Sequence, residues 1–451
     1  MTGRRTALAA SFATLLLFFA IVPVSAQEIQ EVSFNEAVHI ALDRNVTIKR
    51  AQNSLTLQAI TVRSERADFY PNLNFSSGAS RNFGLQFDQT TGTLETTSTD
   101  GFNYSASTGI SLFSGFSNVA TLASARALLD AQEFTLERTK QNIVFSVIRN
   151  YLNVILSEES IRIQQENVQA QRGLLEQIEE FVRVGSRAIS DQYQQQAILA
   201  NSELILLNAE SSYQTNMTRL IQVLQLDPLG EYRFLAPNAD ELPLIISTFD
   251  PEAMLLGAFE NRVDLRAQKY VIDAAEQGIR VAKSGHLPSL SFSASMGSSY
   301  SSARTDNFNS QLSDNRSERL GFNLSIPLFN RYNVKRGVES SKVQFSNAQL
   351  DLENAEQNVA IEVRQAYLDY LSAVKRLDVT ETSLRAANQA LRVEQERYDV
   401  GASTLVELTQ SRSQFVNAAS QRAQAIFQFH FQHRLIDYYQ GTLDPNQPLF
   451  N

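Results

Sequence analysis

The sequence predicts a mainly α-helical protein with a small β part, built from a strand-strand-helix-helix unit that occurs twice. Three observations predict this: an internal repeat, segments with two-residue alternation, and helical periodicity over very long stretches. The repeat is visible in RVGSRAISD (183–191) and DVGASTLVE (399–407), whose glycines lie 216 residues apart. The same offset relates further pairs: Glu36 and Glu252, Asn45 and Asn261, Leu112 and Leu328, Tyr151 and Tyr367.

The repeat divides the chain into residues 27–235 and 236–451, two halves that we expect to form one structural unit. The match slips by one residue only around Pro71 and Pro288. A unit of roughly two hundred residues is far longer than the repeats of about 20 to 50 residues that build solenoids and propellers. Two such halves therefore predict one architecture and not an array.

Residues 1–26 have the layout of a secretory signal peptide: Arg4 and Arg5, an apolar run over 7–22, and a small-residue end at Val24-Ser25-Ala26. Without these two arginines, 37 of the 39 basic residues remain against 48 acidic ones, a net charge near −11. This charge argues against nucleic acid as a partner. The chain has no cysteine, which excludes disulfides and thiolate metal sites.

No second stretch approaches the roughly 18 apolar residues of a membrane-spanning helix. An exported chain of this kind would be soluble in the periplasm, secreted, or a barrel in an outer membrane.

Residues 34–68 have apolar side chains three and four apart and contain neither Pro nor Gly, which predicts one helix. Pro71 ends this segment, and Pro288 ends its counterpart, because proline removes a donor and disfavours helical dihedrals in the residue before it. Beyond each proline the period changes to two. Four segments alternate in this way: about 73–87, 102–113, 290–300 and 319–329.

Weak alternation over about ten residues is typical of transmembrane β-strands, which need about 9 to 11 residues to cross a bilayer. The alternative interpretation is a half-buried hairpin of a soluble protein. Four strands per chain cannot close a barrel, and an open edge in lipid would leave backbone groups unpaired. Two copies would supply eight strands, and three would supply twelve and leave a lumen.

A long helix is predicted from Ser117 to about Val182, where Gly173 is the only glycine and no proline occurs. At 1.5 Å per residue, about 65 residues extend about 100 Å. After the corner at Gly185 a shorter helix is predicted from about Ser190 to Leu226, followed by a linker over 235–251. Helices of this length, rich in Ala, Gln and Ser, favour coiled-coil packing.

This order of elements resembles the TolC-like outer-membrane efflux proteins. The motifs that carry the resemblance are FYPNLNFS and HLPSLSFS, LFSGF and PLFNRY, and the corners FVRVGSRAISD and RYDVGASTLVE. The resemblance implies a homotrimer with a twelve-stranded barrel in outer-membrane lipid and an α-helical tunnel through the periplasm. It also implies a periplasmic adaptor and an inner-membrane pump of the RND, ABC or MFS type as partners. From the residues themselves we expect no cofactor and no metal.

The resemblance also assigns roles to residues of the two corners. It places Asp191 and Tyr398 at a periplasmic gate, with a hydrogen bond from the tyrosine across it, and Glu407 in the pore as a ring of three carboxylates. The adaptor would dock on the tips, which comprise Val184, Gly185, Ser186, Val400, Gly401 and Ala402. Pro71 and Pro288 would mark the junctions between helix and strand.

Two positions depart from the family pattern. Ser403 stands where the family has a gate arginine, and Gln410 stands where a second pore acid often occurs, so we expect a looser gate and one acidic ring. Arg183 or Arg187, in the other corner, is a hypothetical partner for an acid. Thr404 and Glu407 also fit a capping box, and Ser190-Asp191 fits an N-cap, so capping is an alternative role for both acids.

Nothing in the sequence indicates an enzyme, because no nucleophile elbow, phosphate-binding loop or dinucleotide fingerprint occurs. His430, His433 and Asp437 have a spacing that could bind a metal, but we interpret them as polar positions on the last helix. Three functions are left: an export conduit, a non-conducting coiled-coil scaffold anchored in the outer membrane, and an enzyme anchored by a barrel. Four membrane-length strands favour the conduit, while the exported substrate is not encoded in the pattern.

Overall fold

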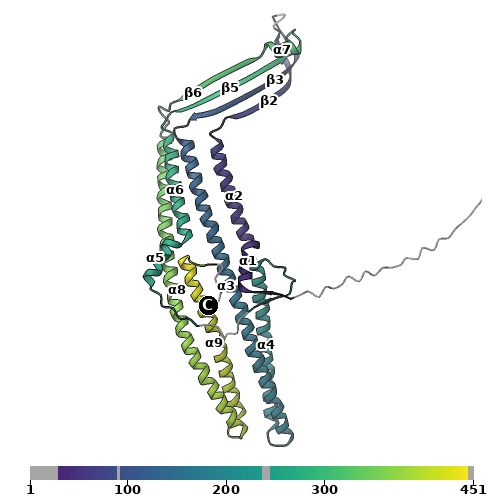
Figure 1. The fold of residues 1–451 in the computed structure, drawn as a ribbon. Helices are drawn as coiled ribbons and strands as arrows, with labels where there is room; N and C mark the ends of the chain where they lie inside the picture. The colour runs from purple at the N-terminus through teal and green to yellow at the C-terminus, as the bar shows by residue number, and fades with distance from the viewer. Residues whose placement is uncertain (1–28, 89–91, 236–243, 445–451) are drawn as a thin grey trace, which may run out of the picture.

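The computed structural model describes residues 29–88, 92–235 and 244–444. Long helices run from a four-stranded sheet at one end of the molecule to two helical hairpins at the other (Figure 1). The predicted mixture of long helices and a small antiparallel sheet is thereby confirmed. The predicted signal peptide and residues 236–243 of the predicted linker lie outside the described residues.

The two halves carry helices of equal length. The first half has α1 (Phe34–Arg44), α2 (Val46–Ala67), α3 (Ser117–Arg183) and α4 (Ile189–Leu224), and the second has α5 (Pro251–Asn261), α6 (Val263–Ser284), α8 (Asn333–Asp399) and α9 (Leu405–Gln440). In both halves these helices contain 11, 22, 67 and 36 residues. The long helices keep the offset of 216, whereas α1 and α2 match α5 and α6 at 217. The one-residue slip therefore extends over these short helices and is not confined to the prolines.

The prediction of a single helix over 34–68 is wrong, because the helix breaks at Asn45. Asn45 has an extended backbone (ψ 125°), its side chain caps α2 by accepting from the Thr47 N–H, and its Nδ2 donates to the Val223 carbonyl at 3.0 Å. In the second half the break falls at Arg262, which is 4% exposed and pairs with Asp264 and Glu362. Both helix breaks are stabilised by contacts with residues far away in the chain, so they cannot be predicted from local periodicity.

The sheet contains β2 (Asn72–Asp88), β3 (Thr93–Phe113), β5 (Ser289–Ser301) and β6 (Ser317–Ser325) in the antiparallel order β2-β3-β5-β6. β3 begins nine residues before the predicted start at 102, and β6 ends four residues before the predicted end at 329. Pro327 lies just beyond β6 and cannot donate to a ladder. The sequence did not predict the short helix α7 (Phe308–Asp314) between β5 and β6, or the parallel pair β1 (Gln30–Val32) and β4 (Tyr232–Phe234).

The strand register separates the sheet into an apolar face and a polar face. Alternation along paired strands places the following side chains on the apolar face: Leu73, Phe75, Ala106, Phe292, Ala294, Met296, Leu320, Phe322 and Leu324. The polar face carries Asn72, Asn74, Ser76, Ser105, Ser107, Gly109, Ser291, Ser293, Ser295, Gly321 and Asn323. Much of this face is not covered, since Leu73, Leu320 and Phe322 are 80%, 76% and 73% exposed.

The main core lies about midway along the helices, where α1, α3, α5, α8 and α9 meet. Tyr151 on α3 is fully buried, and its hydroxyl donates to the Leu235 carbonyl at 2.6 Å and lies 3.3 Å from the Val32 carbonyl. Tyr370 on α8 bonds both backbone groups of Ser247. Each long helix therefore holds a connecting segment of its own half through a buried tyrosine. None of the helices described is long and apolar enough to cross a membrane.

We expect Tyr151→Phe to lower the free energy of unfolding by about 1 kcal/mol, since it removes a net hydrogen bond while keeping the ring. The matched control is Tyr367→Phe, the repeat counterpart of Tyr151, whose hydroxyl has no hydrogen bond in the described structure. Thermal unfolding followed by circular dichroism measures both. Equal stability of the two variants would contradict the assignment.

Candidate functional site: the hairpin tips and the seam between them

The two hairpins turn through corners of closely similar backbone geometry, the first corner being residues 184–188 and the second 400–404. Gly185 (φ +78°) and Gly401 (φ +76°) have the left-handed conformation that ends a helix with least strain in glycine, as the sequence predicted. The Ser186 N–H donates to the Phe181 carbonyl and the Ala402 N–H to the Arg397 carbonyl, both at 2.8 Å. The duplication therefore reproduces the same helix end twice.

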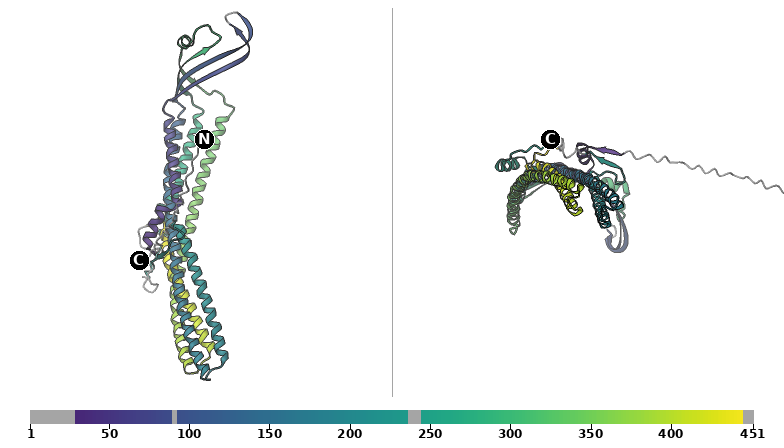
Figure 2. Two further views of the ribbon diagram at one scale, coloured as in Figure 1. Left: turned by 90° about the vertical axis from the view of Figure 1, so that its right-hand side faces the viewer. Right: turned by 90° about the horizontal axis from the view of Figure 1, so that it is seen from below.

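The corners lie at the end of the molecule farthest from the sheet (Figure 2, left). Val184 is 66% exposed and Val400 79% exposed. The neighbouring Gly185, Ser186, Gly401 and Ala402 are exposed as well. All six residues predicted to dock an adaptor therefore lie at accessible positions.

Glu407 is the acid of a capping box, the alternative role that the sequence left open. Its Oε2 accepts from the Thr404 N–H at 2.9 Å, and the Thr404 hydroxyl accepts in turn from the Glu407 N–H. The Thr404 N–H and the hydroxyls of Ser403 and Thr404 hold the pKa of Glu407 below its ordinary value. This stabilisation is present above the ordinary carboxyl pKa near 4.5 and is lost as the pH falls through the lowered one. Glu407 is also exposed, so capping does not exclude a role in a pore.

The predicted N-cap at Ser190-Asp191 is wrong. The N-cap residue of α4 is Ala188, which has no side-chain acceptor, and the helix already begins at Ile189. Asp191 lies in the first turn, where an acid is favoured by the helix dipole, and it is half-buried.

Ser403, expected from the resemblance at the position of a gate arginine, lies between two carboxylates. Its hydroxyl is 2.9 Å from Glu407 Oε2 and also contacts Glu394 Oε1. Glu394 is 9% exposed and pairs with Arg397 at 3.0 Å. Glu394 is not predicted from the sequence, because it is nine residues from Ser403 and the two meet only once the corner has formed.

A small apolar cluster, which we call the seam, joins the two hairpins above the corners. It consists of Leu174, Ile178 and Val182 on α3 with Leu391, Tyr398, Leu405 and Leu408 on α8 and α9. Tyr398 is 1% exposed, and the Arg187 guanidinium of the first corner lies 4.7 Å from the centre of its ring. A cation over an aromatic ring is attracted by the ring quadrupole. Arg187 therefore contacts an aromatic ring, and Arg183 pairs with Glu180 of its own helix. Among the described residues, neither arginine forms an ion pair with an acid of the second hairpin, which was the hypothesis from the sequence.

Tyr398 and Asp191 come together at this seam without a hydrogen bond between them. The Tyr398 hydroxyl is buried and has no partner within the described ranges. Burial raises the pKa of Tyr398, Arg187 opposes the rise, and the charge of Asp191 adds to it. Asp191 therefore affects Tyr398 through its charge, and Arg187 contacts the Tyr398 ring.

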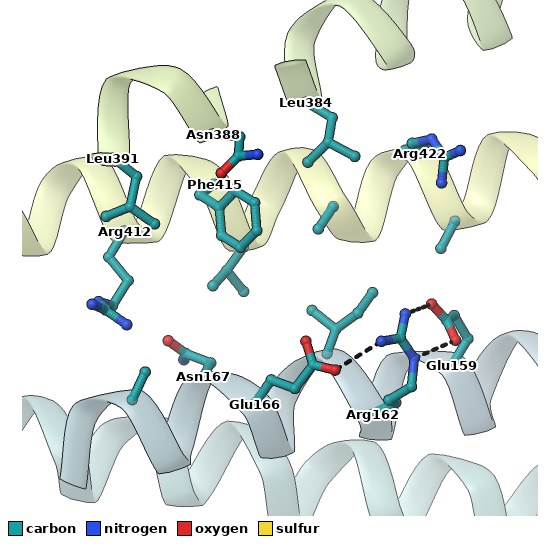
Figure 3. Close-up of a pocket in the computed structure, with 15 residues that line it drawn as sticks. Glu159, Arg162, Glu166, Asn167, Leu384, Asn388, Leu391, Arg412, Phe415 and Arg422 are labelled. Carbon is teal, nitrogen blue, oxygen red and sulfur yellow. Dashed lines mark hydrogen bonds and ion pairs between the residues drawn. The ribbon is translucent and has the colours of Figure 1, made fainter. Parts of the chain in front are cut away.

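A cavity of about 350 Å³ continues the seam between α3 and the α8–α9 hairpin (Figure 3). On one side Arg162 is neutralised by Glu159 and Glu166. On the other side Arg412 donates to Gln395 at 3.3 Å, while its Nε is buried without a partner among the described residues. Burial lowers the pKa of Arg412. The hairpins are thus incompletely packed on each other along this stretch.

The remaining predicted positions lie elsewhere. Pro71 and Pro288 each stand one residue before a strand, as junctions between helix and sheet. Gln410 is exposed on α9, less than one turn beyond Glu407. His430 is buried and half-buried His433 lies beside it, and burial lowers the pKa of His430 to about 4. Within the described ranges no group of three or more His, Asp or Glu could hold a metal.

Comparison with known proteins agrees with this architecture. The sequence profile of the outer membrane efflux protein family matches residues 37–224 and 257–430. This chain belongs to that family. It is 26% identical over 320 residues to the outer membrane protein TolC of Salmonella enteritidis, covering 69% of this chain and 64% of that protein. It is 24% identical over 389 residues to TolC of Vibrio cholerae, covering 84% of this chain and 83% of that protein.

The fold of this family member is also found in solved structures. The Campylobacter jejuni CmeC outer membrane channel matches with a TM-score of 0.76 at 18% identity, covering 92% of this chain and 87% of that chain. The family consists of transport channels, which agrees with the expectation that the chain is not an enzyme.

We expect Arg187→Gln to weaken the contact between the hairpins by about 0.5 to 1 kcal/mol, because it removes the cation from the Tyr398 ring. Amide exchange in residues 174–182 should become about two- to fivefold faster in hydrogen-exchange measurements. Tyr398→Phe is the control, since the hydroxyl has no partner and the ring stays. Faster exchange in Tyr398→Phe would show instead that the hydroxyl is bonded in the assembled protein.

Proposed function

We propose that three copies of this chain form an outer-membrane channel of a tripartite efflux or type I secretion system. The channel conducts substrates passively from an inner-membrane pump to the outside. The strands of the three copies close a twelve-stranded barrel in lipid, and the helices continue it as a tunnel through the periplasm. A homotrimer of duplicated chains presents six similar hairpin tips to an adaptor.

The observation that carries the proposal is the chemistry of the two sheet faces. Four side chains of the apolar face are more than 70% exposed: Leu73, Phe75, Leu320 and Phe322. Exposed apolar surface lowers stability in water, and contact with lipid would remove this cost. The opposite face carries serine, asparagine and glycine, which suit a water-filled lumen. A half-buried hairpin of a soluble protein would instead have its apolar face covered by other elements.

The roles of gate, pore and docking tips come from the resemblance to the family, and the geometry of the corners supports them. Tyr398 belongs to the seam, whose separation would widen the tunnel, and the charge of Asp191 acts on it. Glu407 is an exposed acid in the first turn of α9. A periplasmic adaptor docks on the exposed tips, Val184–Ser186 and Val400–Ala402. The adaptor connects the channel to a pump of the RND, ABC or MFS type. The chemistry of the tips does not select among these pumps.

Conductance across planar bilayers tests the channel directly. We expect discrete channels that favour cations, because three Glu407 carboxylates would concentrate cations at a narrow point. Glu407→Gln should reduce the ratio of cation to anion permeability, while glutamine keeps part of the capping box. Gln410→Glu should raise the ratio by adding a second ring.

The matched control is Glu353→Gln, an exposed acid on α8 far from the corners, which should leave selectivity unchanged. Selectivity that Glu407→Gln does not alter would remove Glu407 from the pore. A protein without conductance, even after Arg187→Gln loosens the seam, would favour the non-conducting scaffold.

Docking is tested by Val184→Asp combined with Val400→Asp. Both valines are exposed, so we expect the free energy of unfolding to change by no more than about 0.5 kcal/mol. Export of a fluorescent dye, in cells where the variant is the sole channel of this kind, should fall strongly. Val343→Asp, at a 60% exposed position on α8, is the control. Normal export by the double variant would place adaptor docking elsewhere.

A further inference from the structure

The β2–β3 hairpin is longer than the rest of the sheet. β2 has 17 residues and β3 has 21, against 13 in β5 and 9 in β6. A strand needs about 9 to 11 residues to cross the hydrocarbon. The outer part of this hairpin therefore extends beyond the lipid and beyond the second hairpin of its own chain.

The extension carries a second apolar region, which we call the outer patch: Phe83, Leu85, Phe87 and Leu94. The register places all four on the apolar face, and they are 78%, 66%, 59% and 64% exposed. The ion pair of Arg81 with Asp100 separates the patch from Leu73 and Phe75 near the helices. Arg81 and Asp100 are charged and exposed, which is unfavourable in hydrocarbon, so we place the outer patch, which lies beyond this pair, outside the acyl chains.

Helix α7 lies on the same face of the sheet. The Phe308 ring is 5.7 Å from that of Phe102 and 5.0 Å from that of Tyr300, two side chains that the register puts on the apolar face. Ser298, on that face too, donates to the Leu312 carbonyl. Phe308 is still 43% exposed. Within one chain α7 is seated on β5, and the outer patch stays uncovered.

Closure of the barrel brings these two surfaces together. The sheet ends in β2 on one side and β6 on the other, so β6 of one copy pairs with β2 of the next. Nine residues of β6 can pair with only nine of the 17 in β2. The unpaired outer part of β2 then faces the β5–β6 connection of the neighbour, which contains α7.

We propose that the outer patch is covered by a second copy of this chain, through α7 and Phe308 of the subunit whose β6 pairs with β2. The contact rests on the proposed trimeric barrel and extends that subunit interface beyond the membrane. The contact joins neighbouring subunits through side chains, in the region where the strands β6 and β2 no longer pair.

The absence of cysteine allows a direct test, because any thiol cross-link must involve introduced residues. The purified full-length protein with Leu85→Cys and Phe308→Cys is treated with an oxidant or a short thiol cross-linker. We expect covalent dimers and trimers on denaturing gels. Their yield should be at least half that of the best of three reference pairs, Phe75→Cys with Leu320→Cys, Phe322→Cys or Leu324→Cys, which report β2–β6 pairing within the membrane. Within one chain the latter two strands are separated by β3 and β5, so their thiols cannot meet.

Each outcome is decisive. Cross-linking of a reference pair without the outer pair would overturn the inference while keeping the trimeric barrel. Failure of the outer pair and of all reference pairs would remove the proposed assembly itself. A Leu85→Cys single variant that links to itself would show that the patches meet one another, which also overturns a contact with α7. Gly78→Cys with Phe308→Cys, which places one thiol on the polar face, is the control that should not react.

Discussion

Unpaired backbone groups along β2 and β6 are the constraint from which the proposed assembly follows. A sheet of four strands has two open edges, and in hydrocarbon each unpaired N–H or C=O group costs several kcal/mol. The apolar face of the same sheet is equally unfavourable in water. Closure by further copies of the chain, as proposed, would relieve both and would orient the serine and asparagine face toward a lumen.

The long helices determine how far the molecule extends from the sheet. Each long helix contains 67 residues, so it extends about 100 Å, a length that no compact core requires. Its stability depends on packing against other helices, in the main core around Tyr151 and Tyr370 and in the seam near the corners. The core is large and the seam is small, so the hairpins are expected to separate at the corners before the core is disturbed.

Duplication makes the two hairpins similar, and the differences between them show where the halves have specialised. The helix lengths are equal, but the strands are 17 and 21 residues in one half and 13 and 9 in the other. At the corners, Gly185 and Gly401 are equivalent, whereas Thr404 caps α9 and Ala188 leaves α4 without a side-chain cap. The second corner therefore has more stabilising side-chain hydrogen bonds, which involve Glu394, Ser403 and Glu407.

The sequence by itself determined the duplication, the glycine corners, the capping box at Thr404, and the segments that become strands and long helices. These depend on local properties: the conformational freedom of Gly401, the missing N–H of Pro288, and periods of 2 and 3.6. Only the tertiary structure decided the break at Asn45, the placing of Arg187 over Tyr398, and the seating of α7 on Tyr300. Each of these depends on a contact between residues far apart in the chain, Asn45 with Val223 for example, and local periodicity carries no record of such a partner.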